Sequence, residues 1–284
     1  MSYANPQALV STDWLANNLD NTMIAVLDGT SHLPTAGRDA DAEFLERHIP
    51  GAQRFDIDEI ADPDAALPHT LPSSELFAKK VGGLGIGNEN RVVVYDVYGM
   101  QSAARVWWMF RVFGHDNIAV LNGGLPKWEA EGRRVTDEFN TPVFAEFEAT
   151  FRPHLVRYIG DIRQFIESRA EQIIDVRATG RFTGTEQEPR PGMRSGHMPG
   201  AINLPFTDLL EGDFKTYMSA DAIHSRVEAA NIDLSQPVTT SCGSGVTACA
   251  LTLGLYLIGK EDVAVYDGSW TEWGGRQDTP VETD

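Results

Sequence analysis

The chain has 284 residues, with 41 acidic against 23 basic side chains and a formal net charge of −18. This balance argues against a nucleic-acid partner, because phosphate binding depends on clusters of Lys and Arg. The longest apolar stretch, around Leu251, is too short to span a bilayer, so no membrane segment is expected. The length suffices for two domains of ordinary size, each with its own core.

Cysteine usage indicates the cellular compartment. Cys242 and Cys249 are the two cysteines, and their short separation argues against a structural disulfide and for a reducing environment. No basic segment followed by an apolar core comes after Met1, so we expect no secretory signal and a cytoplasmic protein. No Cys-x-x-Cys pair, phosphate-binding loop or ligand cluster is present, so no metal or other cofactor is expected.

Short apolar strands alternate with amphipathic segments along the first half of the chain, residues 1–137. The helices are predicted at 12–18, 74–81 and 102–113. The strands are predicted at 23–27, 91–95 and 118–121. Ser73 or Ser74 is expected to cap the second helix, and Gly82 to end it. This alternation is typical of a parallel sheet with helices on both faces.

The second half repeats the pattern after a break. Residues 138–156 show no helical period and contain Pro142 and Pro153, which predicts a linker laid over the domain surfaces. In residues 157–284, helices are predicted at 161–169, 220–229 and 246–258. Strands are predicted at 172–174, 238–240 and 263–266. The sequence therefore predicts an α/β protein with two domains, 1–137 and 157–284.

Four landmarks recur at a nearly constant separation in the two halves, which indicates a duplicated domain. The corresponding pairs are Asp28 and Asp175, His48 and His197, Asp96 and Cys242, and Trp128 and Trp273. Since both copies keep the histidine and the strand-end aspartate, we interpret these as structural residues. Asp96 cannot supply a thiolate, so only the second half is expected to be catalytic.

Cys242 stands where a short β-branched strand gives way to a small-residue loop and then to an apolar helix. A thiol is acidified among backbone N–H groups at the positive end of a helix. Gly243, Ser244 and Gly245 let the chain curl tightly and turn its amides inward. The pattern therefore predicts a nucleophile at Cys242. Cys249 lies two helical turns further on and is interpreted as core packing.

Three motifs together resemble the tandem rhodanese-domain sulfurtransferases: the His-[Ile/Met]-Pro-Gly-Ala turn in both halves, the lone loop cysteine, and Asp267-Gly-Ser-Trp270. The resemblance covers essentially the whole chain. It implies two rhodanese-like domains, each a parallel sheet flanked by helices on both faces. Within that family, the loop from Cys242 to Thr247 is similar to the 3-mercaptopyruvate type, whereas the thiosulfate type has basic side chains directly after the cysteine.

The resemblance also implies donor-binding residues. Arg181 and Arg190, on a loop rich in Gly and Pro, match the arginines that hold the donor, and a guanidinium can grip a carboxylate through two hydrogen bonds. The alternative is that they pair with Glu186 or Glu188 on a solvated loop.

A further set of residues is expected to carry the chemistry. Asp58 and His69 of the first half match residues that complete a triad with the loop serine, here Ser244, by the logic of an acid–base relay. A persulfide anion would be stabilised by the loop amides and the following helix. The loop residues concerned are Gly243, Ser244, Gly245, Val246 and Thr247.

The expected reaction is attack of Cys242 on the sulfur of 3-mercaptopyruvate, release of pyruvate, and transfer from a persulfide to cyanide or a thiol acceptor such as thioredoxin. The alternative is a thiosulfate:cyanide sulfurtransferase, but this loop lacks the cations that a dianionic donor needs. A cysteine phosphatase is disfavoured because Ala248 stands where its phosphate-binding arginine would be. A non-catalytic binding module describes the first half only.

Overall fold

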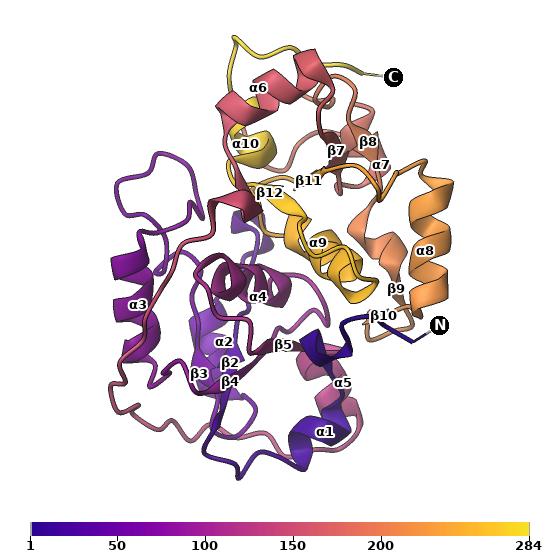
Figure 1. Ribbon diagram of the computed structural model, residues 1–284. Helices are drawn as coiled ribbons and strands as arrows, with labels where there is room; N and C mark the ends of the chain where they lie inside the picture. Colours follow the sequence, from indigo (N-terminus) through magenta and orange to yellow (C-terminus); the bar gives the residue numbers. More distant parts are fainter. Residues whose placement is uncertain (1, 284) are drawn as a thin grey trace.

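The computed structural model describes residues 2–283 and contains two five-stranded parallel sheets, one from each half of the chain (Figure 1). The strand orders are β1-β5-β4-β2-β3 and β6-β12-β11-β7-β8, so each strand of one sheet has a counterpart at the same place in the other. The predicted α/β class and the duplication are confirmed. In both sheets the central strand, β4 or β11, is the one that leads to Asp96 or Cys242.

The first sheet has its strands at β1 (Leu9–Val10), β2 (Ile24–Asp28), β3 (Gln53–Arg54), β4 (Arg91–Tyr95) and β5 (Ile118–Leu121). Its helices are α1 (Thr12–Ala16), α2 (Ala40–Glu46), α3 (Ser74–Gly83), α4 (Ala103–Val112) and α5 (Gly124–Ala130). Strand β4 consists mainly of buried valines, as a central parallel strand requires. Ser73 caps α3 by accepting a hydrogen bond from the Leu76 N–H, as predicted.

The second sheet has its strands at β6 (Val156–Arg157), β7 (Gln172–Asp175), β8 (Ile202–Asn203), β11 (Val238–Ser241) and β12 (Ala264–Tyr266). A small antiparallel pair, β9 (Leu210–Glu211) and β10 (Thr216–Tyr217), stands apart from it. The helices are α6 (Ile159–Ser168), α7 (Thr179–Phe182), α8 (Ala220–Ala229), α9 (Ala248–Leu257) and α10 (Ser269–Trp273). The predicted helix at 246–258 is therefore shorter at both ends. At its start, residues 246 and 247 still belong to the loop that follows Cys242, residues 243–247, which we call the cysteine loop.

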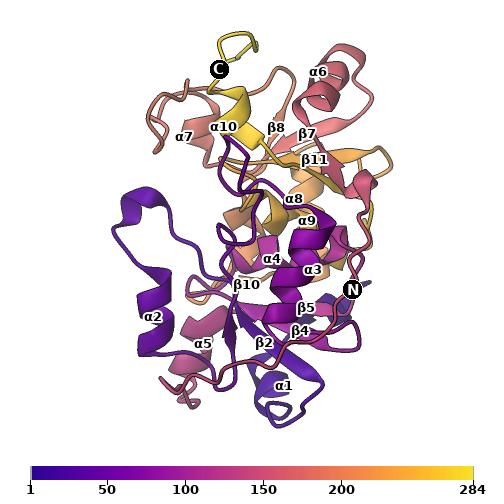
Figure 2. The same cartoon turned by 90° about the vertical axis from the view of Figure 1, so that its left-hand side faces the viewer.

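Two helices form the centre of the domain interface. Every residue of α4 is buried, and α9 packs against it with nearly all of its side chains buried. Figure 2 shows the first sheet in the lower part of the molecule and the second in the upper part, with α4 and α9 between them. Because apolar area is buried from both domains here, their relative position is fixed by a continuous core.

Residues 138–152 of the predicted linker, 138–156, run without helix or strand over the first domain and past α3 (Figure 1), and Pro153–Leu155 form a 3-10 turn before β6. Ala145 donates its N–H to the Gly82 carbonyl at 3.0 Å, and Thr150 donates to the Phe113 carbonyl at 2.9 Å. A Cβ at Gly82 would lie 2.4 Å from the Ala145 carbonyl oxygen, so only glycine allows this approach. The linker is thus bound along the first domain.

A buried arginine crosses the interface. Arg105 on α4 is 0% exposed, and its Nη2 lies 2.7 Å from Oδ1 of Asp267, which follows β12 in the other domain. The same Nη2 donates to the His69 carbonyl at 2.5 Å, and Nη1 donates to the Gly245 carbonyl at 3.2 Å. Asp267 Oδ2 accepts the N–H of Leu71 at 2.9 Å. One ion pair therefore ties a loop of the first domain to the cysteine loop of the second.

We expect Arg105→Met to lower the free energy of unfolding by about 3–5 kcal/mol, since it leaves Asp267 as an unpaired buried charge. Urea denaturation measures this value. Arg134→Gln is the control, because the Arg134 side chain is 72% exposed and its removal should cost less than about 0.5 kcal/mol. Adding Asp267→Leu to Arg105→Met should restore part of the loss. An equal loss of unfolding free energy in Arg105→Met and in the control would contradict a structural role for the ion pair between Arg105 and Asp267.

Candidate active site

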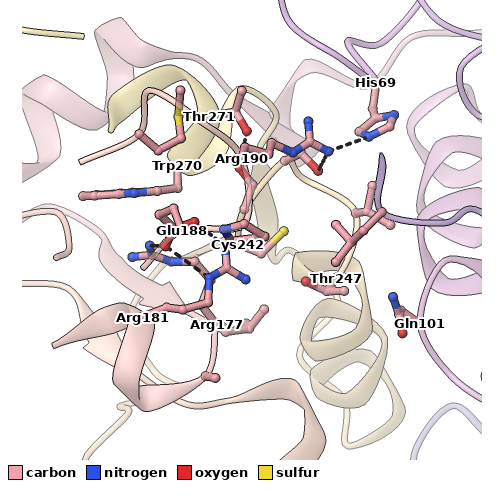
Figure 3. A pocket seen from close by; sticks show the side chains of 18 of the residues that line it. His69, Gln101, Arg177, Arg181, Glu188, Arg190, Cys242, Thr247, Trp270 and Thr271 are labelled. Atoms are coloured by element: carbon pink, nitrogen blue, oxygen red, sulfur yellow. Dashed lines mark hydrogen bonds and ion pairs between the residues drawn. The ribbon is translucent and has the colours of Figure 1, made fainter. Parts of the chain in front are cut away.

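Cys242 lies at the carboxyl end of β11 and faces a cavity of about 240 Å³ between the domains. Its side chain is 1% exposed. The first domain contributes Ser31, His32, Leu33, His69 and Gln101 to the wall. The second domain contributes the segment that carries Arg177, Arg181 and Arg190, the cysteine loop, and Trp270. Figure 3 shows Cys242 between two groups: Arg190 with His69 on one side, and Glu188 with Arg177 and Arg181 on the other.

The cysteine loop leaves its amides available. Among residues 2–283, the backbone N–H groups of Gly243 to Thr247 have no hydrogen-bond partner, and α9 begins directly after Thr247. The Cys242 N–H itself donates to Ser269 Oγ at 3.2 Å, which fixes the start of the loop. Such unpaired amides at the N-terminus of a ten-residue helix suit an anion.

The first domain shows which group such a loop accommodates. Asp96 occupies the position of Cys242, and its carboxylate accepts the N–H groups of Tyr98 at 2.8 Å, Gln101 at 2.8 Å and Ala103 at 2.9 Å. The carboxylate oxygens stand two bonds beyond Cβ, which is also where the outer sulfur of a cysteine persulfide would stand. The corresponding loop of the first domain therefore holds a negative charge at that distance from the chain.

The two predicted donor-binding arginines differ in their partners. Arg181 donates to both carboxylate oxygens of Glu188, at 3.1 Å from Nε and 2.5 Å from Nη2, so the alternative of a pair with Glu188 is what the structure contains. The pair is nonetheless in the cavity wall and not on a solvated loop, since the Glu188 side chain is 3% exposed. A Cβ at Gly243 would lie 3.2 Å from Arg181 Nη2, so the small residue leaves room for this guanidinium.

Arg190 has no carboxylate within ion-pair distance among the described residues. Its Nη2 lies 3.3 Å from His69 Nε2 and 3.3 Å from Ser244 Oγ. Burial lowers the pKa of Arg190, although the nearby Cys242 and Asp58 oppose that shift. A cation in this position can bind the carboxylate of a small anionic donor.

Asp58, His69 and Ser244 come together across the interface, but not as a direct relay. Asp58 Oδ1 lies 2.6 Å from His69 Nδ1, within hydrogen-bonding distance but without good alignment, and this contact holds the pKa of Asp58 below its usual range. No hydrogen bond joins His69 to Ser244 in residues 2–283; Arg190 lies between them. His69 also has φ of 61°, in the left-handed region, and Arg105 holds its carbonyl.

Three further residues shape the site, Arg177, Asp175 and Glu188, and the sequence does not identify them as functional. Arg177 is 1% exposed and pairs with Asp175 Oδ2 at 2.6 Å, with Glu188 Oε1 at 2.7 Å, and with the face of Trp270, 4.3 Å from the ring centroid. The sequence treats Asp175 only as a strand-end residue and Glu188 only as a competing partner. Arg177 lies two residues after Asp175 and four residues before Arg181, and this second arginine near a predicted donor-binding residue is the sequence feature that could have identified it.

Two kinds of feature are absent from residues 2–283, a cluster of metal ligands and a membrane-spanning helix. No group of three or more His, Cys, Asp or Glu side chains is arranged to hold a metal ion. No helix in this range has the length and apolar character that crossing a membrane requires.

Residues 11–131 and 159–276 each match the family model described as a rhodanese-like domain. The chain therefore belongs to the rhodanese family and contains two tandem copies of its domain, which confirms the resemblance seen in the motifs. The structure is similar to that of SseA, a 3-mercaptopyruvate sulfotransferase of Escherichia coli, with a TM-score of 0.84 and 34% identity, covering 93% of this chain and 98% of that one.

Two relatives carry different names for their donors. The chain is 47% identical to the 3-mercaptopyruvate sulfurtransferase of Homo sapiens, over 95% of this chain and 94% of the relative. It is 45% identical to the thiosulfate sulfurtransferase of Bos taurus, over 98% of this chain and 94% of the relative. Because the two identities are nearly equal, overall similarity does not choose between the donors, and the local chemistry of the site must.

The two cysteines should differ sharply in reactivity. Cys249 is 0% exposed, burial raises its pKa, and its thiol donates to the Gly245 carbonyl at 3.3 Å, whereas Cys242 faces the cavity. We expect iodoacetamide to modify Cys242 in the folded protein and to modify Cys249 at least about a thousandfold more slowly, because that thiol is reached by unfolding. Peptide mapping by mass spectrometry measures both rates. Labelling of both cysteines in urea is the control. Labelling of Cys249 in the folded protein faster than this thousandfold limit would contradict its assignment as a buried core residue.

Proposed function

We propose that this protein is a 3-mercaptopyruvate sulfurtransferase that works through a persulfide on Cys242. The observation that carries the proposal is the combination of a loop cysteine with five loop amides and one arginine, Arg190, for which residues 2–283 supply no hydrogen-bond partner and no carboxylate partner, respectively. A donor with a single carboxylate matches one free cation. The names of two of the similar proteins support the same reading.

In the first half-reaction, the Cys242 thiolate attacks the thiol sulfur of 3-mercaptopyruvate. The new S–S bond forms as the C–S bond breaks, and its electron pair passes to the carbon of the leaving fragment as the enolate of pyruvate. The proton of the donor thiol passes to the enolate carbon, directly or through water, which gives pyruvate and leaves the persulfide as an anion. Arg190 binds the donor carboxylate, and the loop amides stabilise the sulfur anion that remains on Cys242.

We assign a positioning task to the residues that the first domain supplies. Asp58 favours the His69 tautomer that carries its proton on Nδ1, which leaves Nε2 as an acceptor for Arg190. Ser244 accepts from the same Arg190 nitrogen. In this proposal the triad acts through Arg190, orienting the guanidinium towards the donor, in addition to the proton relay that the sequence suggests.

In the second half-reaction, a thiolate attacks the outer sulfur and Cys242 leaves as a thiolate, which completes the cycle without a redox cofactor. We propose a dithiol protein such as thioredoxin as the physiological acceptor and cyanide as a substitute in the assay. We also propose that the protein works in the cytoplasm, since both cysteines are free thiols, as a reducing compartment favours.

The competing function is transfer from thiosulfate, which one similar relative is named for. Thiosulfate carries two negative charges, and the loop offers no basic side chain from Gly243 to Thr247. We therefore propose it as a side activity at most, on electrostatic grounds.

Steady-state kinetics with the two donors tests this function. We expect kcat/KM for 3-mercaptopyruvate to exceed that for thiosulfate by at least about tenfold, the value of one unmatched charge contact. Cys242→Ser should abolish transfer from both donors, while Cys249→Ser is the matched control and should retain it. A wild-type preference for thiosulfate, or activity of Cys242→Ser, would overturn the proposal.

A further inference from the structure

The arginines that line the cavity outnumber the buried carboxylates that pair with them. Three arginines line it, Arg177, Arg181 and Arg190, and two buried carboxylates pair with them, Asp175 and Glu188. The carboxylate of Asp58, in the first domain, is 59% exposed, contacts His69 and does not line the cavity. The second-domain wall of the cavity therefore carries one positive charge in excess, apart from Cys242 itself.

That excess charge can be assigned to a residue. Arg177 is matched by Asp175, whose Oδ1 and Oδ2 lie 3.0 Å from Nε and 2.6 Å from Nη2 of the guanidinium, respectively. Its remaining Nη2 contact goes to the Gly196 carbonyl at 2.7 Å. Glu188 Oε1 also accepts from Arg177 Nη1 at 2.7 Å, but Glu188 contacts Arg181 through both of its oxygens, so we assign its charge to Arg181. Arg190 is the cation that remains.

We infer that Glu188 is a specificity-determining residue: it neutralises Arg181, so that the donor cavity offers a single unpaired cation and selects donors with one negative charge. Arg181 keeps N–H groups that can donate to an uncharged oxygen of the donor, but it adds no net charge. A dianion that enters the cavity places its second charge near the Glu188 carboxylate, whose side chain is 3% exposed, and charges repel each other more strongly where they are shielded from water.

This position makes Glu188 different from an ordinary surface glutamate. Its side chain is 3% exposed, it lies in the wall beside Cys242, and Figure 3 shows it between Arg177 and Arg181. Glu186, two residues earlier on the same loop, is exposed and does not line the cavity. The inference deepens the proposed sulfurtransferase function and rests on it for its biological meaning, but the charge selection itself can be measured without turnover.

The test is protection of Cys242 from iodoacetamide by unreactive anions, with inorganic sulfate as the dianion and pyruvate as the monoanion. We expect Glu188→Gln to strengthen sulfate protection by about tenfold or more, because it frees the charge of Arg181, and to change pyruvate protection by less than about threefold. Glu186→Gln is the matched control and should change neither. Thermal unfolding of each variant shows whether the fold is retained.

A second variant separates charge from structure. If the gain comes from Arg181, the double variant Glu188→Gln with Arg181→Gln should lose it, while still folding. Unchanged sulfate protection in Glu188→Gln, or an equal gain for sulfate and pyruvate, would overturn the inference. These outcomes do not depend on which donor the wild type uses, so a failure here is distinguishable from a failure of the proposed function.

Discussion

The buried ion pair between Arg105 and Asp267 is the contact on which the active site depends. Arg105 comes from the domain without a nucleophile, and it holds the carbonyl of Gly245 in the cysteine loop and the carbonyl of His69 in the opposite loop. Since an arginine with 0% exposure is stable only when its charge is matched, the two domains cannot separate without exposing or orphaning it. The cavity beside Cys242 is thereby kept at a fixed width.

This arrangement explains how a duplicated chain came to have one reactive site. In the first domain the amide-lined loop is filled by its own carboxylate, Asp96, and in the second it is left open beside Cys242. The first domain instead supplies side chains to its partner's cavity, with His69 on one wall and Gln101 on another (Figure 3). Duplication has therefore divided the work between a domain that reacts and a domain that completes the wall.

Much of the fold could be predicted from the sequence because the information is local. The inner strands β2, β4, β5, β7, β11 and β12 are runs of apolar and β-branched residues. Helices α3 and α8 begin after a capping serine, and α4 and α9 are long, largely apolar segments. The edge strands β1, β3, β6 and β8 have two residues each and exist through pairing with a neighbour, which no local pattern records. Most of the short helices, such as α7 and α2, are not predicted for the same reason, although the five-residue α1 is.

The candidate site shows the same division. Cys242 and its loop could be predicted because strand, turn and helix follow one another along the chain. The partner of Arg181 could not, since the choice between a donor and Glu188 depends on burial in three dimensions. Likewise, the position of Arg190 between His69 and Ser244 depends on the docking of two domains. Charge balance inside a cavity is a property of the assembled site.

The most direct test of the whole account is a single turnover without an acceptor. The protein is mixed with excess 3-mercaptopyruvate, pyruvate is quantified, and the sulfur content of each cysteine peptide is read by mass spectrometry. The account predicts one pyruvate for each protein molecule and one added sulfur atom, located on Cys242. Pyruvate release without sulfur on Cys242, or sulfur on Cys249 with Cys242 unmodified, would contradict it.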